Sequence, residues 1–202
     1  MKKIYLLFLI LLSTQLLYAQ RFGGGFYGGM AGSQVDGDSY GGYHKVTVLF
    51  GAFTNTDITD KMDLQLELNY MEKGSKAGSN DPTLYYHCKL DYIQLPVVVK
   101  YKIYNKWTAE LGLAGGYLFN AQEDKDGGGF LEPDPIFKKY EISGIAGIYY
   151  HLNDNFEINV RFNYSILPVR EHPGEQVYYL NRGAYNNVMG IAVYYTLGKR
   201  NK

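Results

Sequence analysis

The sequence predicts an all-β protein, an eight-stranded antiparallel up-and-down transmembrane β-barrel. Three observations support this fold: strictly alternating segments, long strands, and connections that alternate between short and long. In residues 156–166 every even position is apolar and every odd position is polar. Successive side chains of a β-strand point to opposite faces, so this segment has one apolar and one polar face. Segment 62–70 repeats the pattern, which fits a strand between lipid and a wet lumen, or a half-buried strand of a soluble sheet.

The N-terminal segment 1–20 is expected to be a signal peptide, which leaves a barrel domain of residues 21–202. Two lysines precede the apolar run 4–12, and cleavage is expected after Ala19 or Gln20. This order of charged, apolar and small residues is typical of a secretory signal peptide. A membrane anchor is the alternative, but a helical span needs about 20 apolar residues and this run is shorter.

Composition excludes few functions, but it gives no support for a nucleic-acid partner or for an internal disulfide framework. The full chain of 202 residues carries 20 basic and 20 acidic residues, so its charge gives no argument for nucleic acid as a partner. Cys88 is the only cysteine, and an exported chain with one cysteine has no internal disulfide framework.

Period-2 alternation predicts eight strands of about ten to fourteen residues each. They are expected at 22–35, 45–54, 62–73, 89–103, 107–120, 138–152, 156–167 and 186–198. A tilted membrane-spanning strand needs roughly 9–11 residues, whereas strands of soluble proteins usually have about 5–6. The strand lengths therefore favour a membrane-spanning barrel.

The connections between these strands alternate in length. The short ones are 55–61, 104–106 and 153–155, and the long ones are 36–44, 74–88, 121–137 and 168–185. An up-and-down barrel places odd connections on one rim and even connections on the other. Short periplasmic turns on one rim and long extracellular loops on the other are typical of outer-membrane barrels.

The expected hairpins can be tested for register, because opposed residues must share a face. A three-residue turn at 104–106 would pair Ile103 with Trp107 on the apolar face and Lys100 with Glu110 on the polar face. The opposite charges of the second pair predict an ion pair inside the barrel.

A turn at 153–155 gives the same agreement in the next hairpin. It would pair Leu152 with Phe156 outside and His151 with Glu157 inside. A shift of one residue would lose both agreements.

A soluble lipocalin-like barrel would turn the same alternation inside out. Against it, the polar face carries charges of both signs, which predict a charge network in a packed lumen. The network is expected to contain Glu67, Lys100, Glu110, Glu141, His151, Glu157 and Arg161. The apolar face ends in aromatic residues, as an interfacial girdle requires. The expected girdle residues are Tyr101, Trp107, Tyr140, Tyr150, Phe156 and Tyr164.

Pro96 lies inside an expected strand. Proline has no backbone donor and normally avoids central strands, and every strand of a closed barrel is central. Pro96 therefore predicts a bulge or a gap in the ladder. A lateral opening used by a partner is the alternative.

One strand also carries a family resemblance. The run Asp91-Tyr-Ile-Gln-Leu-Pro-Val-Val-Val-Lys-Tyr101 resembles the Tyr-Leu-Glu-Ile-Pro-Leu-Leu-Leu-Lys-Tyr strand of the PorT-like outer-membrane β-barrel family of Bacteroidetes. The glycine-rich start at Gly23–Gly29 and the strand Gly112–Tyr117 are also similar to that family. The resemblance implies an eight-stranded outer-membrane barrel and little about activity, because most members have no assigned role. The basic tail after Tyr195 departs from the terminal aromatic of many outer-membrane proteins.

Candidate chemistry is sparse. His44, His87 and His172 are expected on the long-loop rim, but their spacing matches no metal-ligand motif. The segments 124–129 and 36–38 resemble fragments of calcium loops without the full spacing. Exposed loop histidines and flexible acidic loops are the simpler interpretations. We therefore expect no cofactor, no metal and no catalytic residue.

The expected function is that of a non-enzymatic protein of the cell outer membrane. It would have a structural, anchoring or assembly-subunit role, with outer-membrane lipid and possible protein partners of an outer-membrane assembly. A lipid- or lipopolysaccharide-modifying enzyme and a narrow solute channel are the alternatives. The pair His151–Glu157 could also respond to protons, although a static place in the network is the simpler expectation.

Overall fold

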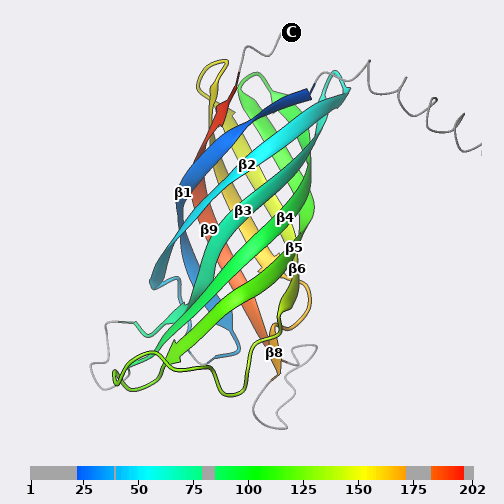
Figure 1. Ribbon diagram of the computed structural model, residues 1–202. Coiled ribbons are helices and arrows are strands. Elements are labelled where there is room, and N and C mark those ends of the chain that lie inside the picture. Colours follow the sequence, from blue (N-terminus) through cyan, green and yellow to red (C-terminus); the bar gives the residue numbers. More distant parts are fainter. Residues whose placement is uncertain (1–21, 39, 79–84, 172–182, 198–202) are drawn as a thin grey trace, which may run out of the picture.

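The computed structural model describes residues 22–38, 40–78, 85–171 and 183–197. It contains a closed antiparallel barrel of eight long strands (Figure 1). They are β1 (Phe22–Asp36), β2 (Lys45–Thr59), β3 (Met62–Lys76), β4 (His87–Tyr104), β5 (Trp107–Asp124), β6 (Tyr140–His151), β7 (Phe156–Ser165) and β9 (Gly183–Thr196), while β8 (Arg170–Glu171) is a short strand paired with the start of β9. The predicted fold class is confirmed.

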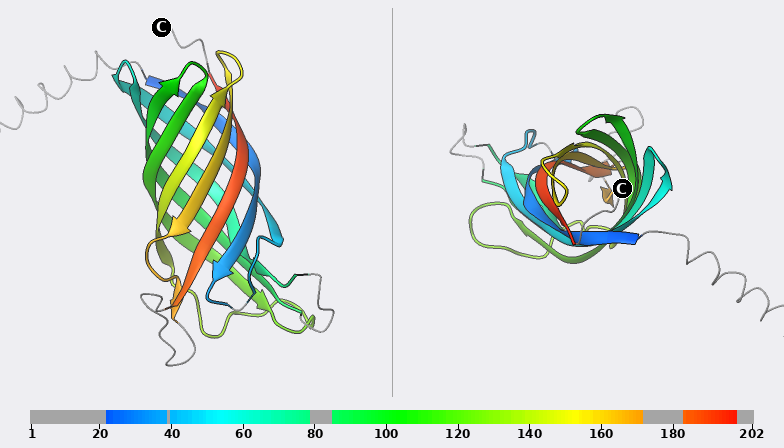
Figure 2. Two further views of the ribbon diagram at one scale, coloured as in Figure 1. Left: turned by 180° about the vertical axis from the view of Figure 1, so that it is seen from behind. Right: turned by 90° about the horizontal axis from the view of Figure 1, so that it is seen from above.

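Each long strand pairs with its neighbour along the chain, and β9 returns to pair with β1. The pairing of β9 with β1 runs from Gly25–Thr196 to Asp36–Tyr185. The view from above shows the resulting ring of tilted strands (Figure 2). Closure removes the free edges of the sheet, which a hydrocarbon environment does not tolerate. None of the described residues forms a helix long and apolar enough to cross a membrane.

The two rims of the barrel differ as the connection lengths predict. The turn rim carries the connections after β2, β4 and β6, together with the start of β1 and the end of β9. The loop rim carries the four long connections, and it lies at the lower end of the barrel in Figure 1.

The strands begin and end close to the predicted positions, with one clear correction. β2 continues to Thr59, so its connection to β3 is Asp60–Lys61 and the predicted connection at 55–61 is wrong. Residues 55–59 are polar except for Ile58, and they still pair with β3, with a register shift between Asp57 and Thr59. The Thr59 side chain then accepts a hydrogen bond from the Met62 amide at 3.1 Å and fixes the turn.

The predicted hairpin registers are confirmed in the lumen and wrong at one turn. Lys100 opposes Glu110, and His151 opposes Glu157. Trp107 opposes Tyr104 rather than Ile103, because the register shifts between Lys102 and Tyr104. The shift leaves a two-residue turn in which Asn105 has a φ of 38°, a conformation that asparagine tolerates better than most residues.

Pro96 produces the predicted gap. The pairing of β3 with β4 runs to Leu66–Val97 and resumes at Asn69–Gln94 in the same register, without a bulge. On its other side Pro96 is paired with Ala114 of β5. Because proline lacks a backbone N–H, the ladder is interrupted only on the side of the strand to which that N–H would have donated.

Burial separates the two faces of each strand. On β3, Leu64, Leu66 and Leu68 are 37%, 48% and 54% exposed, whereas the intervening Gln65 and Glu67 are 0% and 1% exposed. The polar side chains are thus inside the barrel and the leucines outside, the reverse of a soluble barrel. Small inward residues make room, since a Cβ on Gly147 would overlap the Glu110 carboxylate.

β2 and β3 separate near the loop rim. Their ladder ends at Leu49–Met71, although both strands continue beyond this pair. Side chains bridge the gap instead: Lys45 donates to two backbone carbonyls at 2.9 and 3.0 Å, and Ser33 bonds both backbone groups of Gly74 at 2.8 and 3.0 Å. Gly74 has a φ of 129°, which favours glycine. Its backbone thus reaches the inward side chain of Ser33 on β1, a strand that β3 does not adjoin in the sheet.

The direction of the faces predicts the accessibility of labels on β7. Nitroxide labels on cysteines replacing Ile158, Val160 and Phe162 should collide more often with a lipid-soluble relaxant than with a water-soluble one in reconstituted vesicles. A label at Asp154, in the turn before β7, should show the opposite preference. Continuous-wave electron paramagnetic resonance measures both. Preferential access of the water-soluble relaxant to the three β7 labels would contradict a lipid-facing wall.

Candidate functional site: the barrel lumen and its cap

The charged residues predicted for the lumen all project to the inside. Six are buried, and His151 is half-buried at the turn rim. They are Glu67 of β3, Lys100 of β4, Glu110 of β5, Glu141 and His151 of β6, and Glu157 and Arg161 of β7. The structure divides them into two separate groups rather than one network.

Arg161 is the centre of the first group. Its guanidinium donates to both oxygens of Glu67 at 2.8 Å and to both oxygens of Glu110 at 2.8 and 2.7 Å. Each contact is bidentate, the geometry that suits the planar guanidinium best. Tyr27 donates to Glu67 at 2.6 Å, and Asn159 donates to Glu110 at 2.8 Å. The two carboxylates therefore contact two adjacent edges of the one guanidinium and share its Nη2.

The sequence predicted an ion pair between Lys100 and its register neighbour Glu110, and this prediction is wrong. The ammonium of Lys100 contacts Glu157 at 3.0 Å and lies 3.7 Å from the centre of the Tyr149 ring. Arg161 contacts both oxygens of Glu110, so Lys100 takes the next carboxylate along the wall. Opposed backbone positions determine which side chains are near, but competition among all cations in the lumen determines the pairs.

His151 extends the contacts of Lys100 and Glu157 to the turn rim. Its Nδ1 lies 2.8 Å from Glu157, and its Nε2 lies 2.8 Å from the Thr108 hydroxyl. Hydroxyl, imidazole and carboxylate in this order are the arrangement of a nucleophile, a base and an orienting acid. Thr108 is only 2% exposed, however, and its hydroxyl lies against the packed lumen.

A second group, around Lys73, was missed by the sequence analysis. Lys73 is fully buried and donates to Glu141 at 2.9 Å and to Asn163 at 2.9 Å. Ser165 donates to Glu141 at 2.6 Å. Glu141 therefore belongs to this group, near the loop rim, and not with Arg161. Lys73 shares the odd, inward parity of Glu67, so extending the alternation to the end of its strand could have identified it.

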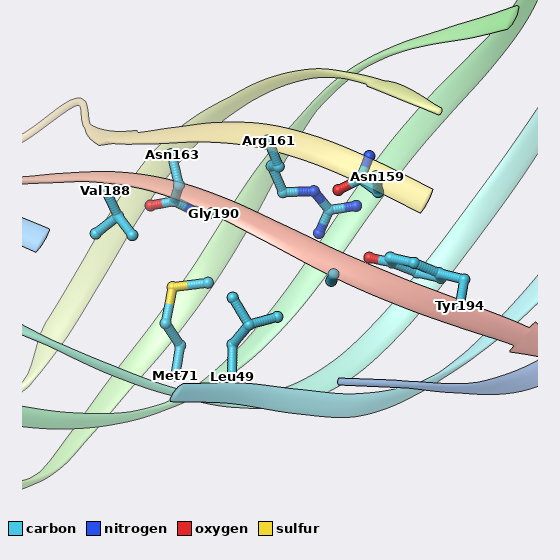
Figure 3. Close-up of a pocket in the computed structure, with 9 residues that line it drawn as sticks. Leu49, Met71, Asn159, Arg161, Asn163, Val188, Gly190 and Tyr194 are labelled. Atoms are coloured by element: carbon cyan, nitrogen blue, oxygen red, sulfur yellow. The ribbon is translucent and has the colours of Figure 1, made fainter. Parts of the chain in front are cut away.

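A small cavity lies between the two groups (Figure 3). Arg161 and Asn163 line one side, and the other side is mostly apolar. The lining residues are Leu49, Met71, Asn159, Arg161, Asn163, Val188, Gly190, Ala192 and Tyr194. The free space suffices for about one water molecule. The lumen is thus a packed interior and not an open pore.

The loop rim is closed by a cap built from residues of several connections. Arg170 donates to Glu123 at 3.0 Å and stacks on Phe137 at 4.3 Å, and Tyr86 donates to Glu123 at 2.5 Å. Burial raises the pKa of Tyr86, so its phenol keeps the proton that it donates. Apolar residues pack with these groups: Val35, Cys88, Leu90, Tyr92, Leu118, Val169 and Ala184. Cys88 is fully buried here.

The aromatic residues predicted for the interfaces lie on the outer face at both ends of the strands. Trp107 contacts Tyr150 at 4.8 Å between ring centres, and Phe156 contacts Tyr195 at 5.0 Å, both near the turn rim. Tyr101 is on the same rim, whereas Tyr140 and Tyr164 are near the loop rim. Their role as interfacial anchors stays a prediction.

The loop histidines and acidic segments do not gather into a site within the described part of the chain. His87 packs its ring against Phe130 at 5.1 Å, and His44 is exposed. His172 lies outside the described residues. The carboxylates of Asp124 and Asp126 accept backbone amides at 2.8 and 2.9 Å and so stabilise a turn. No group of three or more histidine, cysteine or acidic residues among those described could hold a metal ion.

Two solved outer-membrane proteins have a similar fold. Ail, the attachment invasion locus protein of Yersinia pestis, determined in complex with the heparin analogue sucrose octasulfate, matches with a TM-score of 0.51 and 14% identity over 88% of this chain and 99% of its own. Neisserial surface protein A (NspA) matches with a TM-score of 0.51 and 13% identity over 87% of this chain and 97% of its own. At these identities the likeness concerns the fold alone. No similar sequence is found among curated proteins.

A family model identifies the chain at the level of sequence. The model of the outer membrane protein beta-barrel domain matches residues 15–170, which is well over half of the chain. The match includes seven of the eight long strands and both hairpins that carry the lumen charges. Sequence and fold therefore agree, and the chain belongs to the outer membrane protein beta-barrel domain family, whose location is the outer membrane.

Proposed function

We propose that this protein is a non-enzymatic barrel with a structural, anchoring or assembly-subunit role in the outer membrane. The observation that carries the proposal is the filled lumen. Arg161 and its carboxylates occupy the half near the turn rim, and Lys73 and Glu141 occupy the half near the loop rim. The Arg170–Phe137 contact then closes the loop rim. In a barrel filled in this way, the outer wall and the loop surface are available for function and the interior is not.

A solute channel is the weaker alternative, because conduction needs a continuous wet path. An eight-stranded barrel has a lumen just wide enough to be filled by side chains. Here the charges that could attract ions are already paired with each other at 2.7–3.0 Å. Removing one partner of such a pair would leave the other charge buried and unpaired, which is strongly unfavourable.

The enzyme alternative now has a specific candidate in Thr108, His151 and Glu157. Nucleophilic attack requires a substrate carbonyl about 3 Å from the hydroxyl. At 2% exposure Thr108 leaves no space for one. Lys100 also shares Glu157, as expected for a network that fixes strand positions. We therefore assign this triplet a structural role.

The loop rim supports a role in assembly. The connection between β5 and β6 exposes apolar side chains beyond the barrel wall: Phe130 is 42% exposed, Leu131 is 75% exposed and Ile136 is 69% exposed. In the side view this connection extends past the outline of the strands (Figure 1). Exposed apolar groups on a loop outside the bilayer are typical of contacts with another protein.

We further infer that the chain is exported with a cleaved signal peptide and belongs to the PorT-like branch of Bacteroidetes. The support is the lysine-led apolar run at 4–12 and the Asp91–Tyr101 strand motif. Membership of that branch would favour a secretion or envelope complex as the assembly. The signal segment lies outside the described residues.

Replacement of Arg161 tests whether the lumen network holds the barrel together. Arg161→Met should lower the free energy of unfolding by about 3–5 kcal/mol, because Glu67 and Glu110 would remain buried without a cation. Urea titration in lipid vesicles, followed by tryptophan fluorescence, measures the change. Lys138→Ala is the matched control, since its 3.9 Å pair with Glu171 is solvent-exposed and should contribute about 0–1 kcal/mol. Equal effects of the two variants would contradict a structural network.

Hydrolysis assays test the non-enzymatic assignment. Purified protein in detergent should release p-nitrophenol from short- and long-chain esters no faster than Thr108→Val, because the buried hydroxyl has no substrate space. A rate in the wild type that Thr108→Val and His151→Ala both abolish would establish the enzyme alternative instead.

A photocrosslinking amino acid at Leu131 tests the role in assembly. Irradiation of intact cells should give a discrete protein adduct from this position, which gel electrophoresis and mass spectrometry can identify. The same group at Leu111, on the lipid-facing wall and 69% exposed, is the matched control and should give lipid adducts only. Lipid adducts alone from Leu131, Phe130 and Ile136 would contradict a partner at this loop.

A further inference from the structure

Besides Glu72, which opposes Asp91 and is paired with Lys45 at 2.9 Å, two carboxylates interrupt the apolar outer wall near the loop rim. Asp36 lies at the end of β1, and Asp91 lies in the part of β4 nearest the loop rim. Both are at outward positions. Asp91 accepts hydrogen bonds from Tyr70 and Asn120, and Asp36 accepts them from the amides of Gln34 and Asn187. Lipid tails cannot satisfy such groups, so each cluster must lie at the level of the lipid headgroups or beyond it.

The Asp91 cluster is neutral within itself. Tyr70 donates to Asp91 at 2.7 Å, and Asn120 donates to it at 2.7 Å. The ammonium of Lys89, two residues earlier on the same strand face, lies 3.6 Å from the carboxylate. The negative charge of Asp91 thus has its cation in the same chain.

The Asp36 cluster repeats this arrangement with one change. Asn187 donates to Asp36 at 3.1 Å, and the Tyr164 side chain lies close enough to interact with this carboxylate electrostatically. The residue two positions earlier on the same face is Gln34, which donates to Asp36 at 2.6 Å. A neutral amide therefore stands where the Asp91 cluster has a lysine. Among the ion pairs formed by the described residues, none includes Asp36.

The surroundings of Asp36 favour an organic cation. Tyr164 and Tyr185 stack with ring centres 6.1 Å apart and planes at 12°, and Tyr185 is the register neighbour of Asp36. Tyr43 joins through Asn187, to which its hydroxyl donates at 2.6 Å. Tyrosine faces attract ammonium groups through their ring electrons. A carboxylate has about four acceptor positions, and the Gln34 and Asn187 amides that donate to Asp36 leave room for an incoming N–H.

We propose that the Asp36 cluster binds the ammonium group of a membrane-lipid headgroup. The cluster faces outward above an apolar wall in which Met30 and Met189 are 57% and 49% exposed. A lipid seated on that wall would place its tails against these side chains and its headgroup beside Asp36. Near the hydrocarbon boundary an unpaired carboxylate is costly, and an external ammonium offsets that cost. This site is independent of any protein partner at the loop rim.

Native mass spectrometry of the full protein tests the site with a defined lipid pair. Micelles would be doped with equal amounts of phosphatidylethanolamine and its N-acetyl derivative, which keeps the phosphate and tails but lacks the positive charge. The wild type should retain the charged lipid about fivefold better. Equal retention of the two lipids would overturn the proposal.

Variants test whether the preference for the charged lipid arises at Asp36. Asp36→Asn removes the charge, and Gln34→Lys supplies an internal cation as Lys89 does for Asp91, so both should abolish the preference. Asp91→Asn is the matched control and should keep it. Loss of the preference in Asp91→Asn, or its survival in both Asp36→Asn and Gln34→Lys, would show that the site lies elsewhere. Heat-dependent migration in gels confirms that each variant is folded.

Free ethanolamine distinguishes a lipid from a soluble amine. At the concentration of the lipid it should not displace phosphatidylethanolamine, because it lacks the tails that contact the wall. Displacement at equal concentration would show that the cluster recognises soluble amines, and the lipid assignment would fall. Failure of the loop-rim crosslink leaves this result unaffected.

Discussion

The contact of Arg161 with Glu67 and Glu110 is the interaction on which the rest of the barrel depends. It joins β7 to β3 and β5 through four hydrogen bonds of 2.7–2.8 Å across the packed lumen. A soluble protein fixes its core mainly by burying apolar side chains, but in this barrel many large apolar side chains face outward, and charged groups share the lumen with a buried apolar cluster. Complementary charge therefore acts together with apolar packing to specify the interior.

The filled interior also explains the shape near the loop rim. Toward this rim β3 leaves β2 after Met71, and Ser33 and Lys45 take over the backbone hydrogen bonds that β2 would have made. The Gly74 backbone thereby reaches the side chain of Ser33, and residues from several connections, among them Phe137 and Val169, pack on the inner face of β4 and β5. The cap and the charged groups below it leave the outer wall and the loop surface as the places where function can reside.

The outer wall is not uniform. Most of it is apolar, as lipid requires. At its loop-rim end, however, Asp36 and Asp91 accept hydrogen bonds from neighbouring side chains, as the carboxylates of the lumen do. One cluster contains its own cation and the other does not. Where a charge lies near a low-dielectric boundary, the presence or absence of one lysine decides whether the site is complete or still needs a ligand.

The fold could be predicted from the sequence because a long, repeated period of two residues predicts two-faced strands, and the strand lengths, the connection lengths and the charges on the polar face then favour an outer-membrane barrel. Alternation determined the eight strands, their inner and outer faces and the registers at Lys100–Glu110 and His151–Glu157, and the missing backbone donor of Pro96 predicted the ladder gap. These are local properties of single strands and hairpins. The outer-membrane family then follows from the same residues.

Only the tertiary structure decided which charges meet. Arg161 and Glu67 are 94 residues apart in sequence, and Lys73 and Glu141 are 68 apart. Closure of the sheet brings such residues together across the lumen, where each cation contacts whichever carboxylates lie within reach of its donors. The same applies to Tyr164 and Asp36, which come from β7 and β1 on either side of β9. Alternation assigns a residue to a face, but the curvature of the closed barrel chooses its partner.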